Sequence, residues 1–141
     1  MADSRHQAVW DWLLTCPHIR DLFFNTLQIE AGSTSLIPSE RIVAEYIDGS
    51  SLRSYDVTLA RVEDVSFDPN DPANVERLAD FEQLTAWIDE QNDAGNFPEF
   101  PSGSTVREIR VLPSESGFMV AQDLRSGKYQ LQFQIEYMRE V

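Results

Sequence analysis

The clearest pattern in the chain is the alternation of apolar and polar residues within residues 129–138, which holds through Tyr137. One parity holds five large apolar side chains, and the other holds three glutamines and a glutamate. Because successive side chains of a β-strand point to opposite faces of the sheet, this run predicts a strand with one buried face. A central strand of a parallel sheet is covered on both faces, so the alternation favours an antiparallel sheet.

Near the start of the chain, apolar residues recur at helical spacing instead. Ser4 and Gln7 have the spacing of a capping box, in which each side chain satisfies a backbone N–H at the start of a helix. An amphipathic helix is therefore predicted over residues 4–15, ending near Pro17. Its apolar stripe consists of Val9, Trp12, Leu13 and Cys16. Trp10 lies off this stripe and packs either at the side of the helix or in an interface.

A second helix is predicted to follow Asp71, a suitable N-cap, and to end at Gly95, which suits the left-handed residue that closes many helices. Its predicted inner face consists of Leu78, Phe81, Leu84, Thr85 and Ile88. Its opposite, acidic side carries Glu76, Asp80, Gln83 and Glu90. Trp87 lies beside this acidic row. We expect the aromatic loop of residues 97–101 to fold over it, the alternative being that its ring is exposed.

The dipeptide Asp48-Gly49 separates two β-rich runs, residues 42–47 and residues 54–62. It is a strong signal for a β-hairpin, because glycine tolerates positive φ and aspartate bonds to the local backbone. The alternation of the second run fails near its end. A bulge or a strand end near Arg61 would restore it.

The remaining segments give weaker signals. Residues 18–32 predict a short helical turn and then a strand through Leu27 and Ile29, with a turn over residues 31–35. Two more strands are predicted at residues 106–112 and 117–121. The elements together predict an α+β fold, an antiparallel sheet with two main helices packed on one face, in a single domain formed by all 141 residues.

The composition is strongly acidic. A formal net charge of −13 repels phosphate groups, so neither a non-specific grip on nucleic acid nor binding to an anionic membrane is expected. Between Glu63 and Glu99 there are eleven acidic residues and one basic residue, Arg77. This segment is either a solvated face that keeps the protein in solution or a docking face for a basic partner.

Candidate chemistry is sparse. Cys16 and His18 are two residues apart, but the only other histidine is His6, whereas a zinc site normally needs four ligands. Residues 68–71 look like the start of a calcium loop but lack its later glycine and acid, and helix capping explains them better. The chain has no phosphate loop, nucleophile elbow or dinucleotide fingerprint. We therefore expect no catalytic residue, cofactor or metal.

The cysteine content and the lack of long apolar segments indicate where the protein is made. The single cysteine cannot form an internal disulfide, so the framework of a small secreted domain is missing. The chain also has neither a signal-peptide core nor an apolar run of about 20 residues. We therefore expect a soluble protein that is made in the cytoplasm.

Four segments taken together resemble a known family. They are Tyr46-Ile-Asp-Gly-Ser-Ser-Leu-Arg53, Trp87-Ile-Asp-Glu-Gln-Asn92, Ile109-Arg-Val-Leu112 and Tyr129-Gln-Leu-Gln-Phe-Gln-Ile-Glu-Tyr137. In this order they are similar to small phage and prophage proteins known as minor capsid or tail-completion proteins, which resemble the tail terminators of long-tailed phages. The resemblance runs from about Trp10 to Tyr137. Some of these relatives carry a chloramphenicol-resistance label, but an acetyltransferase of that kind needs a histidine base, and both histidines here are N-terminal.

This resemblance implies a non-enzymatic role in tail completion or head-tail joining. A ring of copies, commonly six in that family, would end the tail tube at the head-proximal end of the virion tail, after synthesis in the host cytoplasm. The implied partners are further copies of this chain, the tail tube and head-completion proteins.

Two other classes of function stay open. One is a cytoplasmic small-ligand binder or enzyme with its pocket between helix and sheet, and the other is a regulator that docks on a basic protein. For a protein interface, the sequence suggests contacts at the hairpin, the acidic helix and the loop after it. The candidate contact residues are Asp48, Arg53, Glu76, Asp80, Trp87, Glu90, Phe97 and Phe100.

Overall fold

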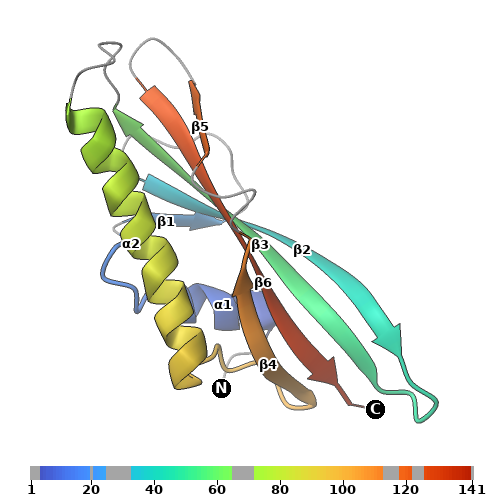
Figure 1. The fold of residues 1–141 in the computed structure, drawn as a ribbon. Helices are drawn as coiled ribbons and strands as arrows, with labels where there is room; N and C mark the ends of the chain where they lie inside the picture. The colour runs from blue at the N-terminus through green and yellow to red at the C-terminus, as the bar shows by residue number, and fades with distance from the viewer. Residues whose placement is uncertain are drawn as a thin grey trace.

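The computed structural model describes residues 4–19, 21–24, 33–64, 72–112, 118–121 and 126–140. Two helices and six strands follow one another along these residues (Figure 1). In chain order they are α1 (Arg5–Leu13), β1 (Asp21–Phe24), β2 (Ser33–Glu45), β3 (Ser51–Asp64), α2 (Pro72–Ala94), β4 (Ser104–Val111), β5 (Phe118–Ala121) and β6 (Ser126–Arg139). The fold is α+β, as the sequence predicts.

The six strands form one sheet in the order β1-β2-β3-β6-β4, and β5 pairs with β6 beyond the end of β4. All pairs are antiparallel except β1 with β2, which run parallel from Asp21 opposite Ser33 to Phe24 opposite Leu36. The sheet is therefore mixed, and the prediction of a wholly antiparallel sheet is wrong at this edge. An edge strand of four residues is too short for its own pattern to indicate direction.

The alternating run predicted near the end of the chain is β6, between β3 and β4 in the sheet. Leu131, Phe133, Ile135 and Tyr137 are fully buried, whereas the glutamines and the glutamate between them are half-buried. On the neighbouring strand, Tyr55, Val57 and Leu59 point to the same buried face, each paired with an inward residue of β6. This strand prediction is confirmed.

Both helices cover that face. In α1, Ser4 Oγ accepts a hydrogen bond from the backbone N–H of Gln7, and the predicted apolar stripe is buried. The Gln7 side chain, however, donates to Asp11 at 2.8 Å rather than completing the capping box. Trp12 of α1 packs on Phe133 of β6 and on Trp87 of α2, with ring centroids 6.0 and 5.0 Å apart. The residues of both helices therefore belong to one apolar core with the sheet.

The end of α2 is as predicted. Gly95 has φ of 70°, and the N–H of Asn96 donates to the carbonyl of Gln91 at 2.9 Å, which satisfies a carbonyl at the helix end. Trp87 is buried, so the prediction that its ring is covered is confirmed, but the ring packed against it is Trp12 of α1, and cover by residues 97–101 stays a prediction. Trp12 in turn donates its Nε1–H to the carbonyl of Asn96 at 2.9 Å. This bond ties α1 to the segment that follows α2.

Two local predictions are wrong. The pairing of β3 with β6 is continuous from Ser51 to Asp64, without a bulge near Arg61. Arg61 instead follows the inward parity and is buried, because its guanidinium donates to Thr34 Oγ1 and to the carbonyl of His18. The turn predicted at residues 31–35 fails over its second half, which is already part of β2.

The hairpin turn and the two later strands lie close to their predicted positions, but β2 begins at Ser33, well before the predicted start at residue 42. An irregularity in pairing that the sequence did not indicate lies in β2, between Ile42 and Ala44. The predictions for Leu27, Ile29 and Asp71 lie outside the described residues.

Candidate protein-interaction surface

The β2–β3 hairpin projects from the end of the sheet that lies away from α2 (Figure 1). Its turn is tightly bonded. Asp48 accepts hydrogen bonds from the N–H of Ser50 at 3.0 Å and from its hydroxyl at 2.6 Å, and these bonds lower the pKa of Asp48. Gly49 adopts φ of 91°, a conformation that side chains with a Cβ rarely adopt. The tip therefore has a defined shape rather than being a loose loop.

This tip is unusually apolar for an exposed segment. Ile47 is fully exposed, at 109% of its reference area, and Tyr46 is 46% exposed. Ile42 and Val43 are also about half-exposed, on the strand that leads to the turn. The irregular pairing between Ile42 and Ala44 breaks the alternation of faces there. Contiguous apolar side chains at a protruding turn are typical of a protein interface. We call these four residues, Ile42, Val43, Tyr46 and Ile47, the hairpin tip.

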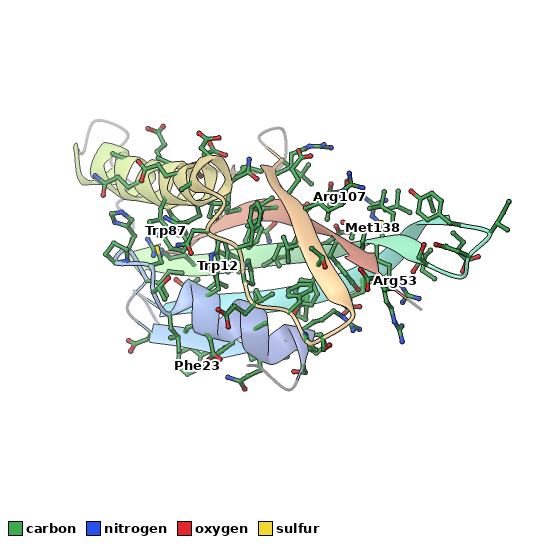
Figure 2. All side chains as sticks on the ribbon, turned by 90° about the horizontal axis from the view of Figure 1, so that it is seen from below. Trp12, Phe23, Arg53, Trp87, Arg107 and Met138 are labelled. Carbon is green, nitrogen blue, oxygen red and sulfur yellow. The ribbon has the colours of Figure 1, made fainter. Side chains whose placement is uncertain are left out.

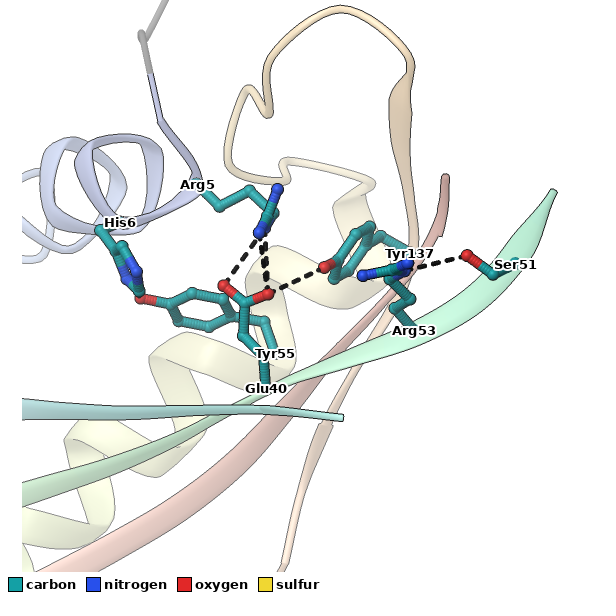
Figure 3. A network of polar contacts seen from close by, with 7 residues as sticks. All are labelled: Arg5, His6, Glu40, Ser51, Arg53, Tyr55 and Tyr137. Carbon is teal, nitrogen blue, oxygen red and sulfur yellow. Dashed lines mark hydrogen bonds and ion pairs between the residues drawn. The ribbon is translucent and has the colours of Figure 1, made fainter. Parts of the chain in front are cut away.

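A polar network anchors the inner face of β2 to α1 where the hairpin leaves the core (Figure 3). The Arg5 guanidinium donates to both carboxylate oxygens of Glu40, at 2.9 to 3.2 Å, and this contact raises the pKa of Arg5. The Tyr137 hydroxyl donates to the same carboxylate at 3.2 Å, and the Arg5 guanidinium lies 5.7 Å from the centre of the Tyr137 ring. One carboxylate therefore joins the first turn of α1 to both β2 and β6.

Aromatic groups extend this network. His6 Nδ1 lies 2.6 Å from the Tyr55 hydroxyl, and Phe100 packs edge-on against both Tyr55 and Tyr137. Burial raises the pKa of both tyrosines, and the negative charge of Glu40 raises it further. Both phenols are therefore protonated at neutral pH. Tyr137 donates to Glu40, and the direction of the bond between Tyr55 and His6 depends on the imidazole tautomer.

Two open pockets flank this part of the molecule. One, of about 320 Å³, is lined by Ser4, His6, Gln7, Trp10 and Phe24. We call it the α1–β1 pocket. The other, of about 370 Å³, is lined by residues 97–100 and 104–106. In the first pocket the Phe24 ring lies 5.6 Å from His6 and 6.5 Å from Trp10, so its floor is mainly aromatic.

The structure distributes the predicted contact residues among different places. Asp48 and Arg53 belong to the hairpin, where Arg53 donates to the Ser51 hydroxyl at 2.9 Å. Glu90 is exposed on α2, and the hairpin turn projects away from this helix (Figure 1). The side chains of Glu76 and Asp80 lie outside the described part of the structure, although both residues belong to α2.

The three predicted aromatic contacts lie elsewhere again. Trp87 and Phe100 are buried in the core, which leaves them little surface to offer a partner, and Figure 2 shows Trp87 beside Trp12. Phe97 is half-buried and lines the second pocket. The hairpin and the acidic helix are therefore separate surfaces.

The hairpin tip itself is not among the residues that the sequence singled out. A signal for it exists: residues 42–47 are apolar at both parities, whereas only one face of the sheet carries predicted helices. An apolar side chain on the uncovered face needs a cover from elsewhere. The apolar residues at both parities of residues 42–47 therefore indicate a strand end with exposed apolar side chains.

Other kinds of site find little support within the described residues. There, no group of three or more histidine, cysteine or acidic side chains is arranged to hold a metal ion. Cys16 is buried, and this burial raises the pKa of its thiol, which favours the unreactive protonated form. No helix in the described ranges has the length and apolar character needed to span a membrane.

No model of a known protein family matches the chain, and no curated protein is significantly similar to it in sequence.

Proposed function

We propose that this chain is a non-enzymatic phage structural protein that acts in tail completion or head-tail joining, as a ring that ends the tail tube. The observation that supports this role is the protruding hairpin tip, which exposes apolar side chains that a lone chain does not cover. Two residues of the tip, Tyr46 and Ile47, also lie within the first motif of the family resemblance, residues 46–53.

The proposed mechanism is geometric. A contact between two different patches of the same chain closes into a ring when the rotation between neighbours closes. Each such interface should bury at least about 1,000 Å² in total. A closed ring at the head-proximal end of the tail would block further addition of tail-tube subunits and would present a new surface to head-completion proteins.

Deletion of the gene from its phage, with complementation by the wild-type chain, tests this role. Electron microscopy of induced lysates should show filled heads together with unattached or overlong tails, and complementation should restore joined particles. Normal infectious particles from the deletion phage would show that the proposal is wrong.

A second candidate function, the binding of a small ligand, is favoured by the α1–β1 pocket. Its volume of about 320 Å³ lies within the range of small-molecule sites, which starts at roughly 300 Å³. Its aromatic lining is also typical of such sites. A ligand that binds only the folded chain would raise the melting temperature in a saturable manner. A panel of metabolites that includes acetyl-coenzyme A, tested against the wild type and Trp10→Ala, would detect it.

A further inference from the structure

We infer that the hairpin tip of one copy inserts into the α1–β1 pocket of a second copy, which makes a head-to-tail contact. This contact rests on the proposed function, because repeated contacts of this kind would build the proposed ring.

The hairpin tip needs a cover that its own chain does not supply. The side chain at its apex, Ile47, is fully exposed, and the bonds of Asp48 hold the turn in a fixed shape. Because the tip is already ordered, little conformational freedom is lost when it docks. It therefore has the properties of a preformed apolar knob.

The α1–β1 pocket has the properties of a receptor for such a knob. Another exposed apolar side chain, Leu14, lies one turn after Trp10 on α1, while Phe23 is exposed on β1 and, as the strand residue next to Phe24, points to the opposite face of the sheet. Its volume of about 320 Å³ lies at the lower end of ligand pockets, which reach roughly 1,000 Å³, and this suits one or two inserted side chains.

The pocket lies beside the base of the hairpin, where His6 contacts Tyr55, but β2 and β3 carry the apex away from α1 (Figure 1), so one chain cannot place its own tip in its own pocket. Figure 2 labels Phe23 beneath α1 at one side and Arg53 at the other, where the hairpin leaves the sheet. When a protrusion of one copy enters a different patch, the pocket, of the next copy, the contact is heterologous. Repetition of such a contact builds closed rings or open filaments.

Local charge favours this pairing despite the net charge of −13 on each copy. The first turn of α1 contains no acidic residue, and a helix N-terminus carries a partial positive charge, while the charge of Arg5 is already paired with Glu40. The hairpin turn is flanked by two exposed carboxylates, Glu45 and Asp48. A docked tip would bring these carboxylates toward the positive end of α1.

A knob alone is smaller than the roughly 800 Å² per partner that a stable interface buries. The contact must therefore include more than the apex. On the hairpin the other exposed apolar residues of the tip, Ile42 and Val43, are available, and beside the pocket Leu14 is exposed. The contact therefore extends along the strand and does not end at Ile47.

Cross-linking of purified protein through introduced cysteines tests the contact. Ile47→Cys and Gln7→Cys place one thiol on the knob and one at the rim of the pocket, both at exposed positions, while the native Cys16 is buried. A mixture of the two single variants, treated with a short bismaleimide, should give a cross-linked dimer. Either variant alone should give only background. The double variant should give a ladder that ends at the number of copies in the ring.

A matched pair provides the control. Glu90→Cys is also at an exposed position, on α2, and Glu90 is not among the residues that line the pocket, so Ile47→Cys mixed with Glu90→Cys should give several-fold less dimer. Equal yields from the two pairs, or no cross-linked product from either, would overturn the inference. Light scattering adds a second measurement: Ile47→Asp should remain folded by circular dichroism, because its side chain makes no core contact, and should be monomeric.

The outcomes separate the contact from the function. Stable oligomers that persist in Ile47→Asp would show that this contact is wrong, while a ring built in another way would still be compatible with tail completion. A clear ladder from the double variant, combined with infectious particles from the deletion phage, would support the contact and refute the phage role.

Discussion

Replacement of Glu40 by alanine tests whether the network beneath the hairpin anchors α1 to the sheet. The Glu40 carboxylate accepts hydrogen bonds from Arg5 and from the Tyr137 hydroxyl. Without it, Arg5 loses its ion pair, and the Tyr137 hydroxyl, on a residue with no exposed surface, loses its acceptor. We expect Glu40→Ala to lower the free energy of unfolding and to loosen the start of α1.

The magnitude follows from the exposure of the two groups. A hydrogen bond to a charged group contributes ~1.5–3 kcal/mol, and a buried hydroxyl left without a partner costs ~1–3 kcal/mol. The Arg5 and Glu40 side chains are 30% and 24% exposed, so solvent reduces the value of the ion pair, and water can enter the vacated space. Taking the lower end of each range, we expect a loss of about 2–3 kcal/mol, measured by urea unfolding.

Two variants serve as controls. Glu40→Gln keeps an oxygen that can accept from Tyr137, so it should cost about 1 kcal/mol less than Glu40→Ala. Arg41→Ala removes the exposed ion pair with Asp56, in which the Arg41 side chain is 52% exposed, and should change stability by at most ~1 kcal/mol. A loss for Glu40→Ala no larger than that for Arg41→Ala would refute this account of the network.

Two further predictions concern titration and the end of α2. The pKa values of Tyr55 and Tyr137 are raised on folding, so their contribution to stability is complete below the unfolded value of about 10 and is lost as the pH rises toward the folded values. Urea midpoints should therefore fall above about pH 10, and Tyr55→Phe should make that fall shallower; an unchanged pH dependence in the variant would contradict the assignment. Gly95→Ala should destabilise the chain by ~1 kcal/mol or more, because φ of 70° is strained for alanine, whereas Gly95→Asn should cost less. Thermal melts of the two variants compare them directly, and equal melting temperatures would contradict the role of the helix cap.

The elements that could be predicted from the sequence are those whose signals are local. The alternation in β6 reports directly which side chains face the core, and the Asp48-Gly49 turn reports where the chain reverses. The apolar stripe of α1 and the Gly95 cap are likewise properties of a few neighbouring residues. In each case one buried face or one special dihedral angle decides the structure.

The elements that could not be predicted depend on residues far apart in the chain. The direction of β1 is fixed by its pairing with β2, and nothing in four residues encodes that choice. The burial of Arg61 depends on a hydrogen bond to the carbonyl of His18, a residue far away in the sequence. The local strand pattern cannot show this partner, so it predicts a bulge where a charged residue faces inward. The cover over Trp87 comes from α1, which precedes it by more than 70 residues.

The candidate interface failed to appear in the sequence for a related reason. Apolar residues are normally assigned to the core, so residues 42–47 alone predict an ordinary strand, and charged and aromatic positions are the more obvious candidates for contacts. Only the structure shows that β2 and β3 extend beyond the helices that would cover them (Figure 1). Exposure is a property of the assembled layers and not of the strand itself.

The separation of the two surfaces has a consequence for assembly. Exposed acidic side chains gather on the second half of α2, where burial and the charge of Asp93 raise the pKa of Asp89. Copies that met through such a face would repel one another, because like charges within the screening length of about 8 Å at physiological salt are poorly shielded. The hairpin tip presents apolar side chains instead, and it lies away from α2. If copies associate through the tip, the acidic face of α2 stays free for a partner of opposite charge, so loss of self-association and loss of partner binding should be separable by mutation.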